Sequence, residues 1–135
     1  MQSETSDART AVLDPALEPT ANRVELIGYV GSNPELRYTR DATPFVRFSL
    51  ATHRWREVDG AWQQLTDWHT VVTYDEPSER SARLRVGELV RVMGSLRTAS
   101  WTDRAGGYRR RTEVLATRVE RAVQLPRQER LPLSA

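Results

Sequence analysis

The 135-residue sequence contains no cysteine, and none of its apolar runs approaches the ~20 residues that a helix needs to cross a bilayer. The absence of cysteine excludes a disulfide framework, a thiolate zinc site and a cysteine nucleophile. The N-terminus has no apolar segment of the secretory kind, and its acidic residues argue against an organelle transit peptide. We therefore expect a soluble cytoplasmic protein with no membrane partner.

Lysine is also absent, so all 20 basic residues are arginine. Arginine pairs with phosphate through two hydrogen bonds and stacks on flat rings, although codon bias in a GC-rich genome produces the same composition. The net charge of +2 is too small to indicate nucleic acid by itself. The first 20 residues carry four acids and one arginine, whereas residues 21–120 carry 16 arginines and 13 acids. The body of the chain is therefore mildly basic.

The chain is expected to form one domain between two loose ends. Residues 1–21 contain two prolines and many small polar residues, which predicts a flexible acidic N-terminal arm. Residues 124–135, also polar and interrupted by proline, predict a flexible C-terminal tail. The intervening residues 22–123 are enough for a single core that needs no disulfide.

The hydrophobic pattern of this domain is mostly that of β-strands. Strands are predicted at Arg23–Val30, Phe45–Thr52, Leu65–Tyr74, Leu89–Arg97 and Arg111–Val119. The remaining predictions are a short extended segment at Glu35–Thr39, a turn at Asp59-Gly60, a helix at Glu76–Arg85 and a hairpin loop at Gly106-Gly107. Five strands with a helix between the third and the fourth indicate an all-β OB-fold, a five-stranded Greek-key barrel, although other five-stranded barrels share this order.

Groups suited to catalysis are scarce. The imidazoles of His53 and His69 are the only ones in the chain. Asp67 and His69 share one face of a predicted strand, as a metal or acid–base site would need, but we favour a histidine that is hydrogen-bonded at a packing surface. The pairs Gly28/Gly31 and Gly106/Gly107 are not phosphate loops, because neither pair opens a helix after a strand and no lysine follows. The sequence predicts no enzyme, no catalytic residue, no metal site and no cofactor.

Aromatic residues are more informative, since four tryptophans are many for so polar a chain. Proteins that bind single strands stack bases on exposed rings and hold the phosphates with nearby cations. The alternative is that these rings fill the barrel. Trp55 lies between two arginines and Trp101 in an expected hairpin loop, and a core would not place tryptophan beside charges or in a turn. The third strand places Trp68 and Tyr74 on one face.

Five segments in order carry a resemblance, namely Asn22–Gly31 (NRVELIGYVG), Asn33–Tyr38 (NPELRY), Phe48–Thr52 (FSLAT), Asp67–Val72 (DWHTVV) and Leu96–Asp103 (LRTASWTD). Together they resemble the bacterial single-stranded-DNA-binding proteins. The likeness runs from about residue 22 to residue 123 and implies an OB-fold homotetramer associated with the nucleoid. It implies binding and protection of single-stranded DNA without sequence preference, in replication, recombination or repair.

The resemblance also implies individual roles. Four aromatic residues match the positions on which bases stack, and these are Trp55, Trp68, Tyr74 and Trp101. His69 matches a position at a subunit contact. Several arginines match positions that are often basic or lie beside the stacking residues, and the predicted contacts to the DNA backbone are Arg23, Arg37, Arg54, Arg56, Arg85, Arg97, Arg104 and Arg109.

The sequence departs from the family pattern where cations are common. Thr70, Asp75-Glu76 and Ala99-Ser100 stand at such positions, so we expect a weaker or less salt-dependent binder. The last residues, Arg127–Ala135 (RQERLPLSA), are basic, whereas the family usually ends in an acidic tip that recruits repair enzymes. This pattern is interpreted as a short, tailless member without acidic-tail docking. The alternative is a protein-interaction module of the primosome-accessory type with weak DNA binding, which the missing cations favour and the intact aromatic set opposes.

Overall fold

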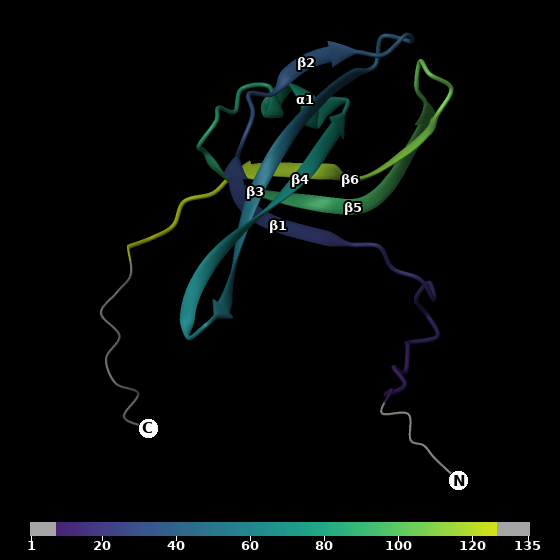
Figure 1. The fold of residues 1–135 in the computed structure, drawn as a ribbon. Coiled ribbons are helices and arrows are strands. Elements are labelled where there is room, and N and C mark those ends of the chain that lie inside the picture. Colours follow the sequence, from purple (N-terminus) through teal and green to yellow (C-terminus); the bar gives the residue numbers. More distant parts are fainter. Residues whose placement is uncertain (1–7, 127–135) are drawn as a thin grey trace.

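The computed structural model describes residues 8–126 of the chain. Residues 1–7 of the expected N-terminal arm and residues 127–135 of the expected tail lie outside the described residues. The elements are β1 (Val24–Val30), β2 (Glu35–Tyr38), β3 (Pro44–Val58), β4 (Ala61–Tyr74), α1 (Glu76–Ser81), β5 (Leu89–Thr102) and β6 (Tyr108–Arg121), as Figure 1 shows.

Six strands form one sheet in the order β1-β5-β6-β4-β3-β2. The sheet closes because β1 also pairs with β3, Tyr29 opposite Ala51 and Val30 opposite Leu50. Strands β4 and β6 are parallel and the other pairs are antiparallel. Five strands therefore make a closed barrel, β2 extends the edge of β3, and α1 lies between β4 and β5. This arrangement confirms the expected all-β barrel of the OB-fold type.

The core lies inside the barrel and follows the alternation of the strands. Residues Val46, Phe48 and Leu50 of β3 point inward and are at most 2% exposed. Valines of four other strands pack against them, since the core also contains Val30, Val71, Val90, Val92 and Val114. Branched side chains fit the pleated inner surface of a small barrel. The alternate residues of the same strands face outward, and we call that side the outer face.

Both long hairpins extend beyond the predicted strands. Backbone pairing of β3 with β4 continues to Val58 opposite Ala61, on either side of the expected Asp59-Gly60 turn. Pairing of β5 with β6 likewise continues to Thr102 opposite Tyr108. Figure 1 shows the two hairpins projecting from the barrel. The sequence pattern missed these extensions because exposed residues, polar or aromatic, occupy both faces there, while the backbone ladder needs no hydrophobic alternation.

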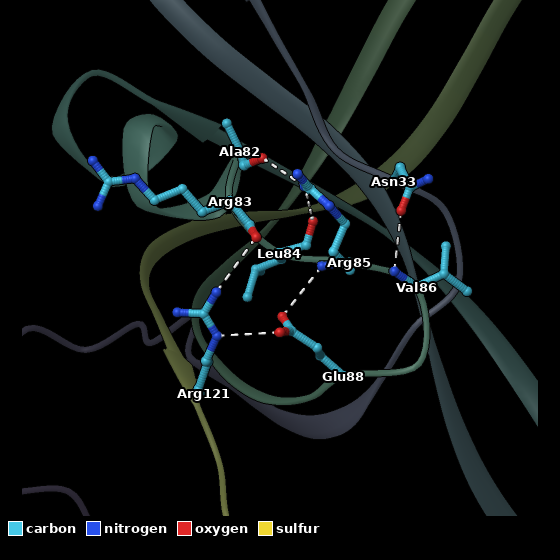
Figure 2. Close-up of polar contacts among 8 residues, drawn as sticks. All are labelled: Asn33, Ala82, Arg83, Leu84, Arg85, Val86, Glu88 and Arg121. Atoms are coloured by element: carbon cyan, nitrogen blue, oxygen red, sulfur yellow. Dashed lines mark hydrogen bonds and ion pairs between the residues drawn. The ribbon is translucent and has the colours of Figure 1, made fainter.

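The helix is shorter than predicted, because α1 ends at Ser81 and not at Arg85. The chain turns after the helix so that Leu84 is buried in the core, only 3% exposed. The turn is tied down by the Val86 amide, which donates to Asn33 Oδ1 at 3.1 Å, and by Arg121, which contacts Glu88 at 3.3 Å (Figure 2). No helix among residues 8–126 is long and apolar enough to cross a membrane.

Gly94 lies beside a β-bulge, because Met93 pairs with Arg118 and Gly94 with Ala116, which leaves Thr117 of β6 without a partner in the register. The register with β6 shifts between Met93 and Gly94. A Cβ at Gly94 would overlap the carbonyl oxygen of Leu115 and lie 2.8 Å from Ala116 Cα, both backbone atoms that cannot move aside. The two backbones can approach this closely only because residue 94 has no side chain.

We predict that Gly94→Ala lowers the free energy of unfolding by about 1–3 kcal/mol, because the new methyl group is forced into the neighbouring strand. Urea unfolding measures this loss. Gly107→Ala is the matched control, since a Cβ there would meet only side-chain atoms of Asp103, the nearest at 3.1 Å. Equal stability of the two variants would contradict the packing of β5 on β6 described above.

Candidate nucleic-acid interface

The four aromatic residues expected to stack on bases share the outer face. Directly paired residues of neighbouring strands point to the same side, and the register places Trp68 opposite Ala51 and Tyr74 opposite Phe45. Trp55 has the same parity in β3 as these two partners. Across the parallel pair of β4 with β6, and then from β6 to β5, the same face continues to Trp101, which lies opposite Arg109.

Three of these rings are open to solvent. The exposed fractions of Trp55, Trp68 and Trp101 are 62%, 63% and 42%. This exposure excludes the alternative in which the tryptophans fill the barrel. Trp101 lies near the end of β5 and not in a loop, which corrects the sequence-based placement. Gly31 leaves room for the Trp68 ring, because a Cβ at residue 31 would overlap that ring.

Tyr74 is half-buried because Arg97 covers it. The guanidinium carbon of Arg97 lies 5.2 Å from the centre of the Tyr74 ring, and Arg97 Nη2 donates to the Tyr74 hydroxyl at 3.0 Å. A second pair of the same kind lies on β5 and β6, where the guanidinium carbon of Arg111 is 5.1 Å from the centre of the Trp101 ring. Cation–π contacts of this kind hold both ring and guanidinium in place.

A buried carboxylate connects these arginines. Glu113 is only 1% exposed. Its Oε1 accepts a hydrogen bond from Arg97 Nη2 at 2.9 Å, and its Oε2 lies 3.1 Å from both Nε and Nη2 of Arg111. Arg47 Nε is 3.7 Å from the same oxygen. Burial alone would raise the pKa of Glu113, but the hydrogen bond from Arg97 and the charges of the three arginines hold that pKa below its ordinary value.

Sequence reasoning assigned no site role to Glu113 or Arg47, and it did not include Arg111 among the predicted backbone contacts. Outward-facing positions of a strand are ordinarily exposed, so an alternating pattern gives no reason to bury a glutamate there. The available signal was hairpin pairing, because a loop centred on residues 103–107 brings Arg97 opposite Glu113. That signal is weak because the register is not known from the sequence, and a slip of one residue between β5 and β6 would give Arg97 a different partner.

Three of the arginines predicted from the sequence join the outer face. Arg97 belongs to the Glu113 cluster, and Arg109 lies opposite Trp101 and pairs with Asp103 at 2.9 Å. Arg37 of β2 pairs with Glu35 at 2.8 Å. Arg37, Arg47 and Arg111 line one groove of about 490 Å³, together with Ser49, Thr70 and other residues of β2, β3 and their neighbours. We call it the outer groove.

Of the arginines predicted from the sequence, only Arg37 lines this groove. By strand alternation, Arg54 and Arg56 point to the opposite side of the β3–β4 hairpin from Trp55, and Arg54 pairs with Asp67 at 2.8 Å. Arg104 lies in the turn between β5 and β6. Arg23 precedes β1 and lines a separate hollow beside β5.

Arg85 has a structural contact of its own. Figure 2 shows its guanidinium directed back to the carbonyl groups that follow α1, where it donates to Leu84 at 3.0 Å and to Ala82 at 3.5 Å. Its backbone amide lies 3.2 Å from Glu88 Oε2. Such contacts satisfy carbonyl groups that a helix end leaves unpaired.

His69 behaves as the packing interpretation predicts. Its Nε2 is 2.8 Å from the Thr52 hydroxyl in a partly buried contact between β4 and β3. His53 Nδ1 has a similar neighbour, the Thr66 hydroxyl at 3.2 Å. In the described part of the chain, no three residues of the His, Cys, Asp and Glu types gather as metal ligands. The subunit contact predicted for His69 stays a prediction.

Comparisons with known proteins show which family the chain resembles. Residues 21–122 match the single-strand binding protein family. The chain is 37% identical over 102 residues to single-stranded DNA-binding protein 1 of Xylella fastidiosa, covering 73% of this chain and 75% of that protein. It is 35% identical over 111 residues to the mitochondrial single-stranded DNA-binding protein of Drosophila melanogaster, covering 79% and 75%. Among solved structures, the Plasmodium falciparum SSB complex with ssDNA matches with a TM-score of 0.69 and 29% identity, over 79% of this chain and 99% of that one.

We predict that Glu113→Gln lowers the free energy of unfolding at pH 7 by about 1–3 kcal/mol, because three arginines lose their shared anion. Since the pKa of Glu113 is lower in the folded chain than its ordinary 4.5, the ionised carboxylate stabilises the fold above that value. This stabilisation is lost as the pH falls through the folded pKa. The gap in unfolding free energy between wild type and variant should therefore shrink below pH 4.5.

Denaturant unfolding between pH 7 and pH 3 measures this gap. Glu35→Gln is the control, because Glu35 and Arg37 form an exposed pair, 69% and 67% accessible, and such pairs contribute little. A Glu113→Gln curve parallel to wild type at every pH would show that the carboxylate does not stabilise the folded chain by its charge.

Proposed function

The chain belongs to the single-strand binding protein family, and on that premise we propose that it binds and protects single-stranded DNA without sequence preference, by stacking bases on outer-face aromatics and pairing phosphates with arginines. The observation that carries the proposal is the common outer face of Trp55, Trp68, Tyr74 and Trp101, with arginine beside two of these rings. Exposed indoles next to fixed cations suit a flexible chain of bases and phosphates.

The proposal assigns binding and not catalysis to the chain, with a role in replication, recombination or repair as the family suggests. Single-stranded DNA is the partner. Arg37, Arg97 and Arg109 contact the backbone on the outer face. Contacts to a strand that continues past this face are assigned to Arg23, Arg54, Arg56, Arg85 and Arg104. We also propose that the protein forms a homotetramer with His69 at a subunit contact. Residues 22–123 are proposed as the DNA-binding domain, between the N-terminal arm and the C-terminal tail.

We predict that oligo-dT strongly quenches the tryptophan fluorescence of the protein, because stacked indoles lose emission. A titration with a long oligo-dT at low and moderate salt measures the effect, and its saturation point gives the site size. Duplex DNA of the same length should quench little, since its bases are already stacked. Flat titrations at both salt concentrations would contradict the proposed function and leave a protein-interaction module as the account to pursue.

We predict that Trp68→Ala and Trp101→Ala each weaken oligo-dT binding by about 5- to 150-fold, the range for losing one stacked base. Tyr108→Ala is the matched control. Tyr108 is 69% exposed at the end of the same hairpin, but it pairs with Thr102 and so faces away from Trp101. Fluorescence anisotropy of a labelled oligo-dT gives the affinities. Similar losses in all three variants would contradict stacking on the outer face.

A further inference from the structure

The outer groove has the lining of an anion site. Its arginines Arg47 and Arg111 come from β3 and β6, far apart in sequence, and Ser49 and Thr70 also line it. The groove also holds one carboxylate, Glu35, but Arg37 neutralises it at 2.8 Å. A volume of about 490 Å³ falls within the range of small-molecule sites. Guanidinium and hydroxyl groups are donors that suit the oxygens of a phosphodiester.

Most of the donors of these two arginines remain available. A guanidinium has five N–H groups. Arg111 directs Nε and Nη2 to Glu113, and Arg47 reaches that carboxylate only through Nε at 3.7 Å. Their side chains are 41% and 45% exposed. Three arginines around one carboxylate leave a local charge of +2, so the cluster keeps an attraction for a further anion.

Glu113 explains why these cations can lie so close together. Like charges repel, and arginine side chains lose conformational freedom when they are held in one geometry. Oxygen Oε2 of the buried carboxylate is hydrogen-bonded to Arg111 at 3.1 Å and attracts Arg47, whose Nε lies 3.7 Å away, so it holds both side chains near the outer face before any ligand arrives. Preorganised donors bind a ligand more tightly because their ordering cost is already met by the fold.

The arginine cluster lies beside one of the rings proposed to stack on a base. Arg111 lies over Trp101, with 5.1 Å between the guanidinium carbon and the centre of the ring. A phosphate on the free edge of Arg111 would therefore lie beside a base stacked on Trp101. Bases and phosphates likewise alternate along a single strand of DNA.

We propose that Arg47 and Arg111 bind a phosphodiester group of the single strand in the outer groove, and that Glu113 beneath them is a positioning residue for this site. The inference rests on the proposed function and deepens it. The opposing view is that the arginines only neutralise Glu113. In that case their loss changes stability and not the salt dependence of DNA binding.

The first test measures oligo-dT affinity against salt concentration for Arg47→Gln and Arg111→Gln. Each variant should bind about tenfold more weakly, and the slope of log K against log salt should fall by about 0.7 for one lost phosphate contact. Arg110→Gln is the matched control, because Arg110 is exposed on β6 but pairs with Ser100 and faces the other side. It should keep the wild-type slope.

The second test measures the DNA affinity of Glu113→Gln, for which electrostatic attraction alone and the positioning role predict opposite changes. Removing the negative charge beneath the groove arginines should tighten DNA binding if electrostatic attraction is all that matters. The positioning role predicts weaker binding, about fivefold at low salt, despite the added positive charge. Circular dichroism and the unfolding curves above verify that the variant is folded under the binding conditions. If it is not, Arg47→Gln and Arg111→Gln still decide the proposal.

Failure of this inference is distinct from failure of the proposed function. If wild type is quenched by oligo-dT but Arg47→Gln and Arg111→Gln keep its slope, the phosphate site is wrong and DNA binding stands. If Glu113→Gln binds more tightly, the positioning role is wrong. Absence of quenching in wild type itself would overturn the proposed function, and the phosphate site with it.

Discussion

The pairing of β1 with β3, Tyr29 opposite Ala51 and Val30 opposite Leu50, joins the two ends of a five-stranded sheet into a barrel. Closure gives every strand an inside and an outside, so alternate residues must serve different purposes. Phe48 and Leu50 fill the interior. The alternate residues of β3, such as Ser49, and their partners on β4, such as Thr70, form one continuous outer face.

Charged contacts order one part of the outer face. Glu113 is buried beneath side chains of arginine, and two of these arginines lie over the rings of Tyr74 and Trp101. A buried carboxylate is costly unless it is paired and hydrogen-bonded, and here both of its oxygens have arginine partners. The same contacts that satisfy Glu113 thus orient the rings and cations that face a ligand.

Much of the fold was predictable from local pattern. Alternation identified the barrel strands, and it placed Trp68 and Tyr74 on a common face of β4. Pro77 and Gly87 predict a helix over Glu76–Arg85, but α1 ends at Ser81 because Leu84 reaches the core from the turn that follows. The polar and charged residues around Trp101 predict a loop, whereas its backbone pairs with Arg109 in β6.

The sequence by itself determined the barrel class, the family and the four candidate stacking residues, because these depend on spacing and residue type within short segments. Only the tertiary structure decided which arginines accompany them. Arg47 and Arg111 are brought together by the register across three strands, whereas Arg85 turns back to the end of α1 and Arg54 to Asp67. The physical reason is that an arginine's role depends on the partner its long side chain reaches, and that partner lies elsewhere in the chain.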